Sequence, residues 1–234
     1  AEILDVNVGH PEIDEKKMMV RVLKAIQSVC DVPLQIDSTK PEVIEAGLRY
    51  YNGKPILNSV NGEEQSLATV LPLVKKYGAS VVGLALDENG IPKTAEGRFE
   101  IAKRIVERAE AVGIDRKDVY IDCLTLTVSA EQAACRQTLE ALHRVKTELG
   151  CKTCLGVSNI SFGLPNRELV NRTFLTMAME QGLDLPIINP NVESMTGAVR
   201  AFRVLNGIDK NSLEFINAYN DAVPAAPVKK ADSN

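Results

Sequence analysis

Six apolar segments of the chain end on a carboxylate or a carboxamide, and these groups can recognise a flat polar heterocycle. The six side chains at these ends are Asn7, Asp37, Asn58, Asp122, Asn159 and Asn189. A carboxylate can accept an N–H and an NH₂ that lie side by side, as it accepts a guanidinium, and an amide offers both a donor and an acceptor. Because an unpaired buried polar group costs about 1–3 kcal/mol, a fixed set of this kind would be a selective site.

Each of these side chains could instead cap a following helix, and this alternative stays open for any single one. Histidine is nearly absent, with His10 in an expected loop and His143 in an expected helix. A Ser–His triad or a His-ligated metal is therefore not expected. Cys151 and Cys154 form a C-x-x-C, but no second cysteine or histidine pair completes a zinc site. We interpret both as core residues and expect no metal.

The elements that must position these side chains are strands that alternate with helices along the chain. Most of the strand-like runs are continuously apolar, which is typical of parallel strands covered on both faces. The expected strands are Ile3–Val8, Pro33–Ile36, Pro55–Val60, Ser80–Leu86, Val119–Leu124, Thr153–Val157 and Leu185–Ile188. This α/β alternation favours a β/α barrel, in which residues at the carboxyl ends of the strands carry the chemistry.

Several helix starts are marked by capping signals. Thr39 and Ser129 each open a pattern with Glu or Gln three residues later, which predicts two capping boxes. Thr94 and Asn166 are predicted as further N-caps. No glycine-rich phosphate-binding motif follows any of the expected strands, so the usual dinucleotide and nucleoside-triphosphate sites are not predicted.

Composition excludes other classes of function. The chain has 234 residues, 45% of them hydrophobic, a net charge of -4 and a sequence pI near 5.4. Such an acidic balance argues against a nucleic-acid partner. The absence of a long apolar run argues against a membrane span. Five scattered cysteines, an odd number, indicate reduced thiols and a cytoplasmic location.

We expect one barrel domain over residues 1–222, and we expect its last element to be a helix over residues 211–222. Residues 223–234, VPAAPVKKADSN, have the composition of a linker or a disordered tail. A linker there would suggest a further domain or a partner beyond it, although a frayed terminus has the same composition.

Longer motifs add a family resemblance to this residue-level interpretation. The segments IDSTKPEVIEAGL, PILNSVNGE, GLALDENGIPKTAEGR, VYIDCL and LGVSNISFGLPNRELVNRTFLTMAM follow one another in the chain. Together they resemble the pterin-binding domain of methyltetrahydrofolate–corrinoid methyltransferases and of cobalamin-dependent methionine synthases. The resemblance covers most of the chain, from Leu4 to about Asn191.

The resemblance implies a TIM (β/α)8-type barrel, similar to dihydropteroate synthase, that binds methyltetrahydrofolate at its C-terminal mouth. It implies that Asp37, Asn58 and Asp122 hold the pterin ring. Asn159 would hydrogen-bond the N5 atom that carries the methyl group, and Arg167 would contact the folate. A Co(I) corrinoid on another protein or domain would accept the methyl group.

Asn7 and Ser158 complete the expected substrate-binding set, because both lie at strand ends next to these residues. No side chain in the set is a strong general acid. We therefore expect the N5 proton to come from solvent, through water held by Asp122 or Asn7. Phe162 matches the phenylalanine of methionine synthases, where some corrinoid methyltransferases carry a polar residue.

Two other functions remain open. A dihydropteroate synthase would be expected to carry a lysine in the stretch that here reads Ser158-Asn159-Ile160, and an Arg-x-His where this chain has Asn189-Pro190-Asn191. A non-catalytic module that only binds folate would keep the same pocket. The sequence does not identify the final methyl acceptor among methionine, acetyl-CoA and demethylation pathways, and a homodimer remains open.

The count of strands departs from the family pattern. Seven strands are expected where a TIM barrel has eight, because the first βα unit of the family has no counterpart before the strand at Ile3–Val8. Seven strands leave an edge on each side of a gap. We therefore expect the chain to be part of a longer polypeptide, or the gap to be filled by a second copy or by the helix at residues 211–222.

Overall fold

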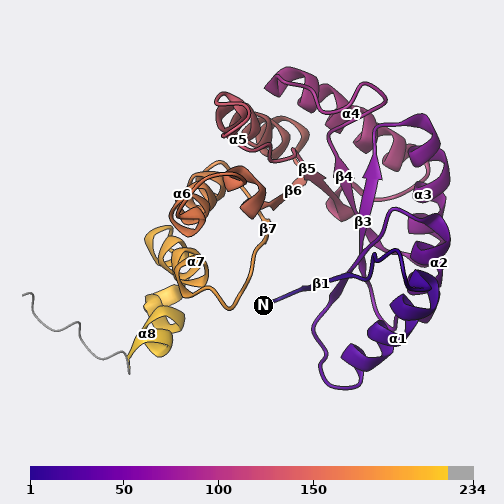
Figure 1. Ribbon diagram of the computed structural model, residues 1–234, viewed down its shortest axis with the longest axis horizontal. Coiled ribbons are helices and arrows are strands. Elements are labelled where there is room, and N and C mark those ends of the chain that lie inside the picture. Colours follow the sequence, from indigo (N-terminus) through magenta and orange to yellow (C-terminus); the bar gives the residue numbers. More distant parts are fainter. Residues whose placement is uncertain (221–234) are drawn as a thin grey trace, which may run out of the picture.

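The computed structural model describes residues 1–220. A single sheet of seven parallel strands runs through it in the order β1-β2-β3-β4-β5-β6-β7. The strands are β1 (Leu4–Asn7), β2 (Leu34–Asp37), β3 (Ile56–Asn61), β4 (Ser80–Leu84), β5 (Val119–Asp122), β6 (Lys152–Gly156) and β7 (Leu185–Ile187). The seven predicted strands are thus confirmed, and the sheet curves into a nearly closed TIM-like barrel (Figure 1).

Helices cover the outer face of the curved sheet (Figure 1). They are α1 (Glu15–Gln27), α2 (Pro41–Tyr50), α3 (Glu64–Tyr77), α4 (Ala95–Ala111), α5 (Ala134–Arg144), α6 (Arg167–Glu180) and α7 (Glu193–Leu205); α8 (Leu213–Tyr219) follows and packs against α7. Short helical turns lie at η1 (Arg116–Asp118), η2 (Val145–Leu149), η3 (Val157–Ser161) and η4 (Lys210–Ser212).

Alternation along each strand divides its side chains between two environments. Residues such as Val6, Ile36, Val81 and Leu155 pack into the main core between the strands and the helices. The alternate positions face the inside of the barrel. Ile56, Val82 and Cys154 form a second, smaller buried cluster there.

Close packing seats α4 on the sheet. A Cβ atom at Gly83 of β4 would lie 2.8 Å from Cγ2 of Ile105, so a larger residue at this position would push the helix outward. Thr94 caps α4 as predicted, with its hydroxyl accepting a hydrogen bond from the Gly97 N–H at 3.2 Å.

The other predicted caps are not formed. Lys40 is the N-cap of α2 without a side-chain bond, so the capping box at Thr39 is wrong. Asn166 occupies the N-cap position of α6 but makes no capping bond. The box at Ser129 is also wrong, because α5 begins only at Ala134 and the Ser129 hydroxyl donates instead to the carbonyl of Phe162 at 2.7 Å.

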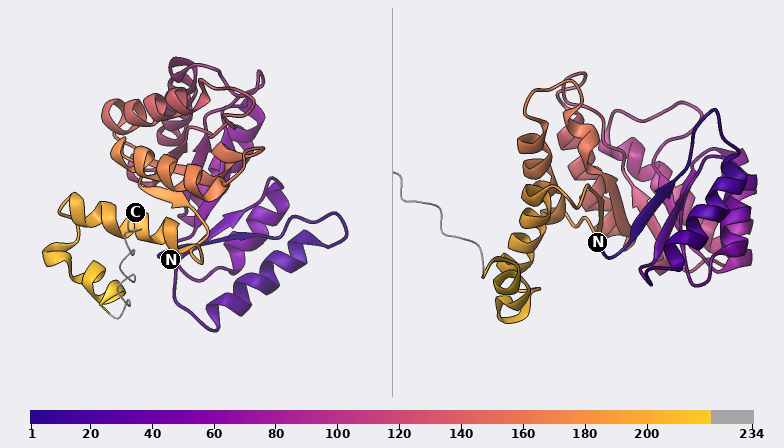
Figure 2. Two further views of the ribbon diagram at one scale, coloured as in Figure 1. Left: turned by 60° about the vertical axis from the view of Figure 1, so that its left-hand side comes forward. Right: turned by 60° about the horizontal axis from the view of Figure 1, so that its bottom comes forward.

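The two ends of the sheet remain separate within residues 1–220. No strand pairs with β7 other than β6, and none pairs with β1 other than β2. The predicted helix at residues 211–222 is shorter, as α8, and it packs against α7, where Tyr219 donates to Glu193 at 2.6 Å. Figures 1 and 2 show α8 away from β1, so it does not fill the gap. The predicted tail over residues 223–234 lies outside the described residues.

Candidate functional site

The inner face of β1, β2 and β3 is polar; Asn7 and Asp37 end their strands, whereas Asn58 lies inside β3 and not at its predicted end. We call this surface the polar wall, and its residues are Asp5, Asn7, Gln35, Asp37 and Asn58. Asn7, Asp37 and Asn58 occupy adjacent positions across the three strands. The parallel register therefore brings three of the predicted site residues side by side.

Asn7 and Asp37 are in direct contact. The Asn7 amide N–H donates to a carboxylate oxygen of Asp37 at 2.8 Å, while its oxygen accepts from the Gly9 N–H at 2.8 Å. Both halves of the amide are thus committed, which fixes its orientation. Burial raises the pKa of Asp37, and the Asn7 bond opposes this shift. Asn7 therefore orients and stabilises the Asp37 carboxylate.

The sequence interpretation missed two members of the polar wall. Asp5 accepts a hydrogen bond from Gln35 at 2.7 Å, and Gln35 is only 1% exposed, with no partner for its own amide oxygen within residues 1–220. Burial raises the pKa of Asp5, while the amides of Gln35 and Asn58 lower it. Asp5 lies two residues before Asn7, and Gln35 two before Asp37, so period-two alternation would have placed both on the inner face.

Asp122 lies at the end of β5, on another part of the ring. It is 8% exposed, and its carboxylate accepts the backbone N–H of Leu124 at 2.7 Å. Burial raises the pKa of Asp122 to about 6, while N–H groups of Leu124 and Gly156 and the charge of Arg98 act in the opposite direction. This carboxyl group therefore changes charge close to neutral pH.

Asn159 lies just past the end of β6, in the turn η3, and its side chain is exposed. A Cβ atom at Gly156 would come within 3.1 Å of the Asn159 amide nitrogen, so the amide lies directly over this glycine. The N–H of the same glycine interacts with Asp122. Gly156 therefore links Asp122 to Asn159.

Arg167 braces the segment that carries Asn159. Its guanidinium donates to the Ser158 carbonyl at 2.9 Å and to the Ser161 hydroxyl at 3.0 Å, and it stacks over the Phe162 ring at 4.3 Å. The hydroxyl of Thr127 and that of Ser129 hold the carbonyl of Phe162 from the β5–α5 connection. The Ser158 side chain is exposed next to Asn159.

Within residues 1–220, the Asn189 side chain makes no hydrogen bond to the other predicted site residues. Its amide oxygen accepts the backbone N–H of Asn191 at 3.0 Å, two residues further on. This is the local turn bond that asparagine forms readily. The alternative of a purely local structural role describes Asn189 better than a binding role does.

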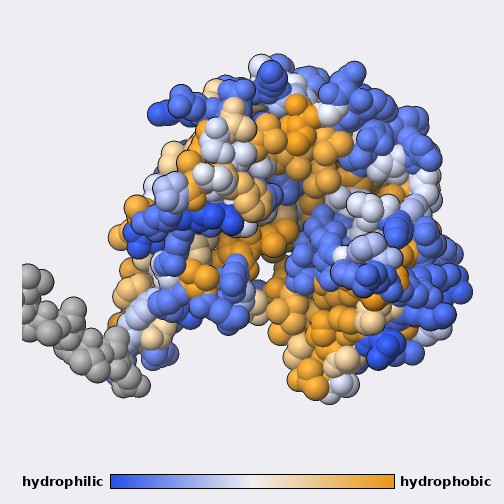
Figure 3. All heavy atoms as spheres, in the orientation of Figure 1, coloured by the Kyte–Doolittle hydropathy of each residue, from blue (hydrophilic) through white to orange (hydrophobic). Residues whose placement is uncertain are grey.

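The rest of the inner face is mainly apolar. We call this surface the apolar wall, and it consists of Val82, Leu84, Tyr120, Leu185 and Ile187. Figure 3 shows hydrophilic and hydrophobic surfaces facing each other across the central hollow. A flat ring with one polar edge suits such a divided interior, because the edge can be hydrogen-bonded while the faces lose contact with water.

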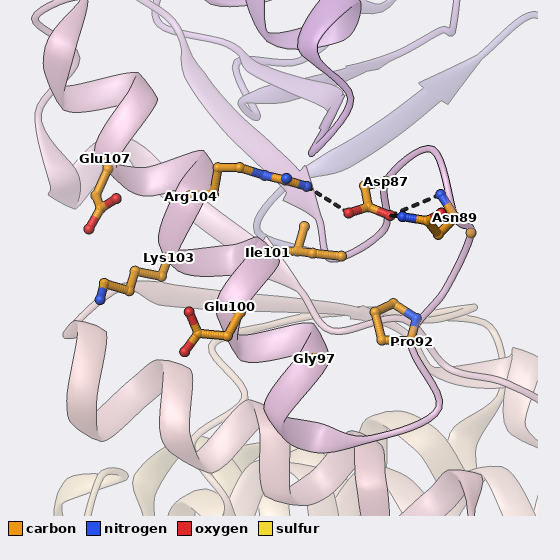
Figure 4. Close-up of a pocket in the computed structure, with 10 residues that line it drawn as sticks. Asp87, Asn89, Pro92, Gly97, Glu100, Ile101, Lys103, Arg104 and Glu107 are labelled. Atoms are coloured by element: carbon orange, nitrogen blue, oxygen red, sulfur yellow. Dashed lines mark hydrogen bonds and ion pairs between the residues drawn. The ribbon is translucent and has the colours of Figure 1, made fainter.

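A separate surface cavity of about 650 Å³ lies outside the ring, between the β4–α4 loop and α4 (Figure 4). Its lining includes Glu100, Lys103 and Glu107, together with an ion pair of Asp87 and Arg104 at 2.8 Å. Charges of both signs alternate along it, and none of the predicted site residues contributes to it. We interpret it as a solvated helix face.

Within residues 1–220, no group of three or more His, Cys, Asp or Glu side chains could hold a metal ion. In the same part of the chain, none of the helices is both long and apolar enough to span a bilayer. Cys151 and Cys154 are buried free thiols.

Comparison with known families and proteins places the chain among pterin-binding enzymes. Residues 1–189 match the family model described as pterin binding enzyme. The chain is 34% identical over 202 residues to a methionine synthase of Mycobacterium leprae, covering 81% of this chain and 17% of that protein. It thus spans less than a fifth of the length of that relative. It is 30% identical over 225 residues to a methylcorrinoid:tetrahydrofolate methyltransferase of Eubacterium limosum, covering 94% of this chain and 82% of that protein.

Similar solved structures include dihydropteroate synthases. The enzyme of Yersinia pestis with a pterine-sulfa conjugate gives a TM-score of 0.70 at 19% identity, over 88% of this chain and 84% of that chain. The enzyme of Xanthomonas albilineans in complex with 7,8-dihydropteroate gives 0.67 at 18% identity, over 88% and 79%. At this identity the likeness establishes the fold.

Proposed function

This chain belongs to the pterin-binding enzyme family, and from that premise we propose that it is a methyltransferase acting between a folate and a corrinoid. In the proposed direction, the N5 methyl group of 5-methyltetrahydrofolate moves to a Co(I) corrinoid carried by a partner protein or domain. The observation that carries the proposal is that Asp122 and Asn159 both lie beside Gly156, in a barrel that also has the polar wall.

The pterin ring is the substrate part that the polar wall fits. Its 2-amino-4-oxo edge presents an N–H and an NH₂ that one carboxylate can accept together. We assign Asp37, Asn58 and Asp122 to this edge and to the ring nitrogens, with Asn7 orienting Asp37. The apolar wall supplies contact for the faces of the ring.

Asn159 is the proposed catalytic residue. When the methyl group leaves, the electron pair of the broken C–N bond stays on N5, and N5 takes up a proton. An amide that can either donate or accept can follow N5 through this change of protonation. Bonds from Arg167 hold the η3 turn that carries this amide, and dipoles positioned in advance stabilise charge as it develops. The corrinoid would supply the nucleophile and would need no activation from this chain.

The source of the N5 proton is proposed to be a water held near Asp122. A carboxyl group with a pKa of about 6 exchanges protons readily at neutral pH, which suits it to relay a proton through such a water. Asn7 is less suited to hold that water, because both halves of its amide are already bonded within the protein.

Ser158 and Arg167 are proposed to contact the folate beyond the ring. Both side chains are exposed beside Asn159. Arg167 also has a structural task, since its bonds to the Ser158 carbonyl and to Ser161 hold the η3 turn. Its substitution would therefore disturb both folate affinity and the position of Asn159.

The name of the Eubacterium limosum relative describes the opposite direction, from a methylcorrinoid to tetrahydrofolate. The same residues serve both directions, because the forward and reverse reactions pass through the same transition state. The dihydropteroate synthase alternative gains no support beyond the fold, since Ser158-Asn159-Ile160 still lacks the expected lysine. Free thiols at all five cysteines support the proposal of a reducing compartment such as the cytoplasm.

The test is an anaerobic methyl-transfer assay with the purified chain, 5-methyltetrahydrofolate and a reduced corrinoid protein. Loss of the Co(I) absorption band that depends on both protein and folate is the expected result, and the reverse reaction is run with a methylated corrinoid and tetrahydrofolate. Folate binding without transfer in either direction would favour the non-catalytic module. Absence of folate binding would contradict the proposal itself.

A further inference from the structure

Arg98, in the first turn of α4, is buried completely, with an exposed fraction of 0%. Its guanidinium bonds four acceptors, and all of them are uncharged. These are the carbonyls of Pro92 (2.9 Å), Cys123 (3.2 Å) and Leu124 (3.0 Å) and the hydroxyl of Thr138 (2.7 Å). The side chain thereby joins the β4–α4 loop, the carboxyl end of β5 and helix α5.

A buried cation with only neutral partners is expensive to desolvate. One terminal nitrogen of Arg98, Nη2, has no hydrogen-bond partner within residues 1–220, which adds to this cost. Neutral side chains could tie the three segments together at a lower cost. We therefore infer that the positive charge of Arg98 has a function of its own, beyond joining these segments.

Arg98 is connected to Asp122 through hydrogen bonds to the backbone of Leu124. Leu124 has a left-handed backbone with φ of 62°, and its carbonyl accepts from both Arg98 and Thr138. On its other side, the Leu124 N–H donates to the Asp122 carboxylate at 2.7 Å. Arg98 thus holds in place the strained residue that orients Asp122, and it adds a positive charge behind that carboxylate.

We propose that Arg98 is a positioning residue that keeps Asp122 oriented and ionised for binding the pterin edge. This inference rests on the proposed function for its ligand, but its effect on Asp122 can be measured without any ligand. A neutral carboxyl group could not accept two adjacent donors from a pterin, so loss of the Asp122 charge would weaken the complex.

Few other ionisable groups act on Asp122. Within residues 1–220 they are the thiols of Cys123, next to it at the end of β5, and Cys154 on β6. Burial raises the pKa of both thiols, so they remain neutral in the range where Asp122 titrates. Leu84, its neighbour on β4, carries no charge. Arg98 is the cation that acts on Asp122.

The direct test is a ¹³C NMR titration of the Asp122 carboxyl group in the ligand-free protein, assigned by its loss in Asp122→Asn. Arg98→Met should raise the titration midpoint by about one pH unit, because the ionised form loses a nearby positive charge. Arg98→Lys keeps the charge without the planar fork, and should return the midpoint most of the way toward wild type. Arg104→Met, on the same helix but paired with Asp87, is the control and should leave the midpoint unchanged.

Thr138→Val provides a milder variant in case Arg98→Met does not fold. It removes the hydroxyl that bonds both Arg98 and Leu124, and should shift the midpoint in the same direction by a smaller amount. In the wild type and the variants, the acid limit of methyltetrahydrofolate binding should follow the NMR midpoint. An unchanged Asp122 midpoint in Arg98→Met and Thr138→Val would overturn the inference. A shifted midpoint in protein that binds no folate would support it while contradicting the proposed function.

Discussion

The polar wall on β1–β3 and the Asp122–Asn159 region on β5–β6 use similar side chains in different surroundings. On the polar wall, Asn7 and Gln35 donate side-chain hydrogen bonds to neighbouring carboxylates. Asp122 instead receives backbone N–H groups and lies next to apolar strands, so burial raises its pKa to about 6. Burial raises the pKa of the carboxyl groups in both regions; side-chain amides oppose this rise on the polar wall, and mainly backbone N–H groups oppose it at Asp122. Asp122 joins the polar wall in binding the pterin edge, whereas Asn159, just past β6, is assigned to the proton-coupled chemistry at N5.

The largest effect should come from Asn159→Ala. The amide contact strengthens as N5 gains a proton, so its loss should slow methyl transfer by about 10²–10³-fold while folate affinity falls by less than about tenfold. Single-turnover rates and calorimetric Kd values measure the two effects separately. Asn89→Ala, an exposed asparagine in the β4–α4 loop, is the matched control and should change neither. Equal losses in rate and affinity would make Asn159 a binding residue only.

Asp37→Asn should act on affinity. The carboxylate would be replaced by an amide that offers an N–H to the donors of the pterin edge, and the Asn7 bond would weaken. An increase of about 10–100-fold in the Kd for methyltetrahydrofolate follows, with a smaller change in the rate at saturation. Asp31→Asn replaces an exposed aspartate and serves as the control. A wild-type Kd in Asp37→Asn would contradict the assignment of the polar wall to pterin binding.

Asp122→Asn should stabilise the ligand-free protein at neutral pH, by up to about 3 kcal/mol in free energy of unfolding. A carboxyl group whose folded pKa is raised to about 6 stabilises the fold only while protonated. Its contribution is present below pH 4 and is lost as pH rises from about 4 to about 6. Denaturant unfolding of both proteins at pH 4 and pH 7 measures this difference. Equal stabilities at pH 7 would show that burial of Asp122 has no such cost.

Gly156→Ala should have the smallest effect, a several-fold loss in transfer rate. The backbone of Gly156 has φ of -73°, which alanine tolerates, so the fold should be retained. The added Cβ would lie 3.1 Å from the Asn159 amide and displace it by a few tenths of an ångström. A small displacement of a group that contacts the reacting atom lowers the rate. A wild-type transfer rate in Gly156→Ala would show that the rate does not depend on the position of the Asn159 amide over Gly156.

The strands were predictable because buried parallel strands are continuously apolar; on β4, Val81 and Val82 point to opposite faces and both are buried. The polar strand ends were predictable for the same reason, since Asp37 and Asp122 interrupt apolar runs. Asp5 and Gln35 were missed because they lie inside a strand, where only the alternation with Asn7 and Asp37 marks them. The predicted cap at Thr39 was wrong because α2 begins one residue later than predicted. The predicted cap at Ser129 was wrong because its hydroxyl bonds the Phe162 carbonyl instead. Arg98 carries no local signal, since its burial depends on how α4 packs on β5.

The central claim is that Asp37 on the polar wall binds the pterin edge, whereas Asn159 acts on N5. The most direct measurement compares Kd and single-turnover methyl-transfer rate in Asp37→Asn and Asn159→Ala with the same folate and corrinoid protein. The account predicts opposite patterns, with weakened binding and a nearly retained saturated rate in the first, and retained binding with a slow rate in the second. The same pattern in both variants would contradict the division of the site.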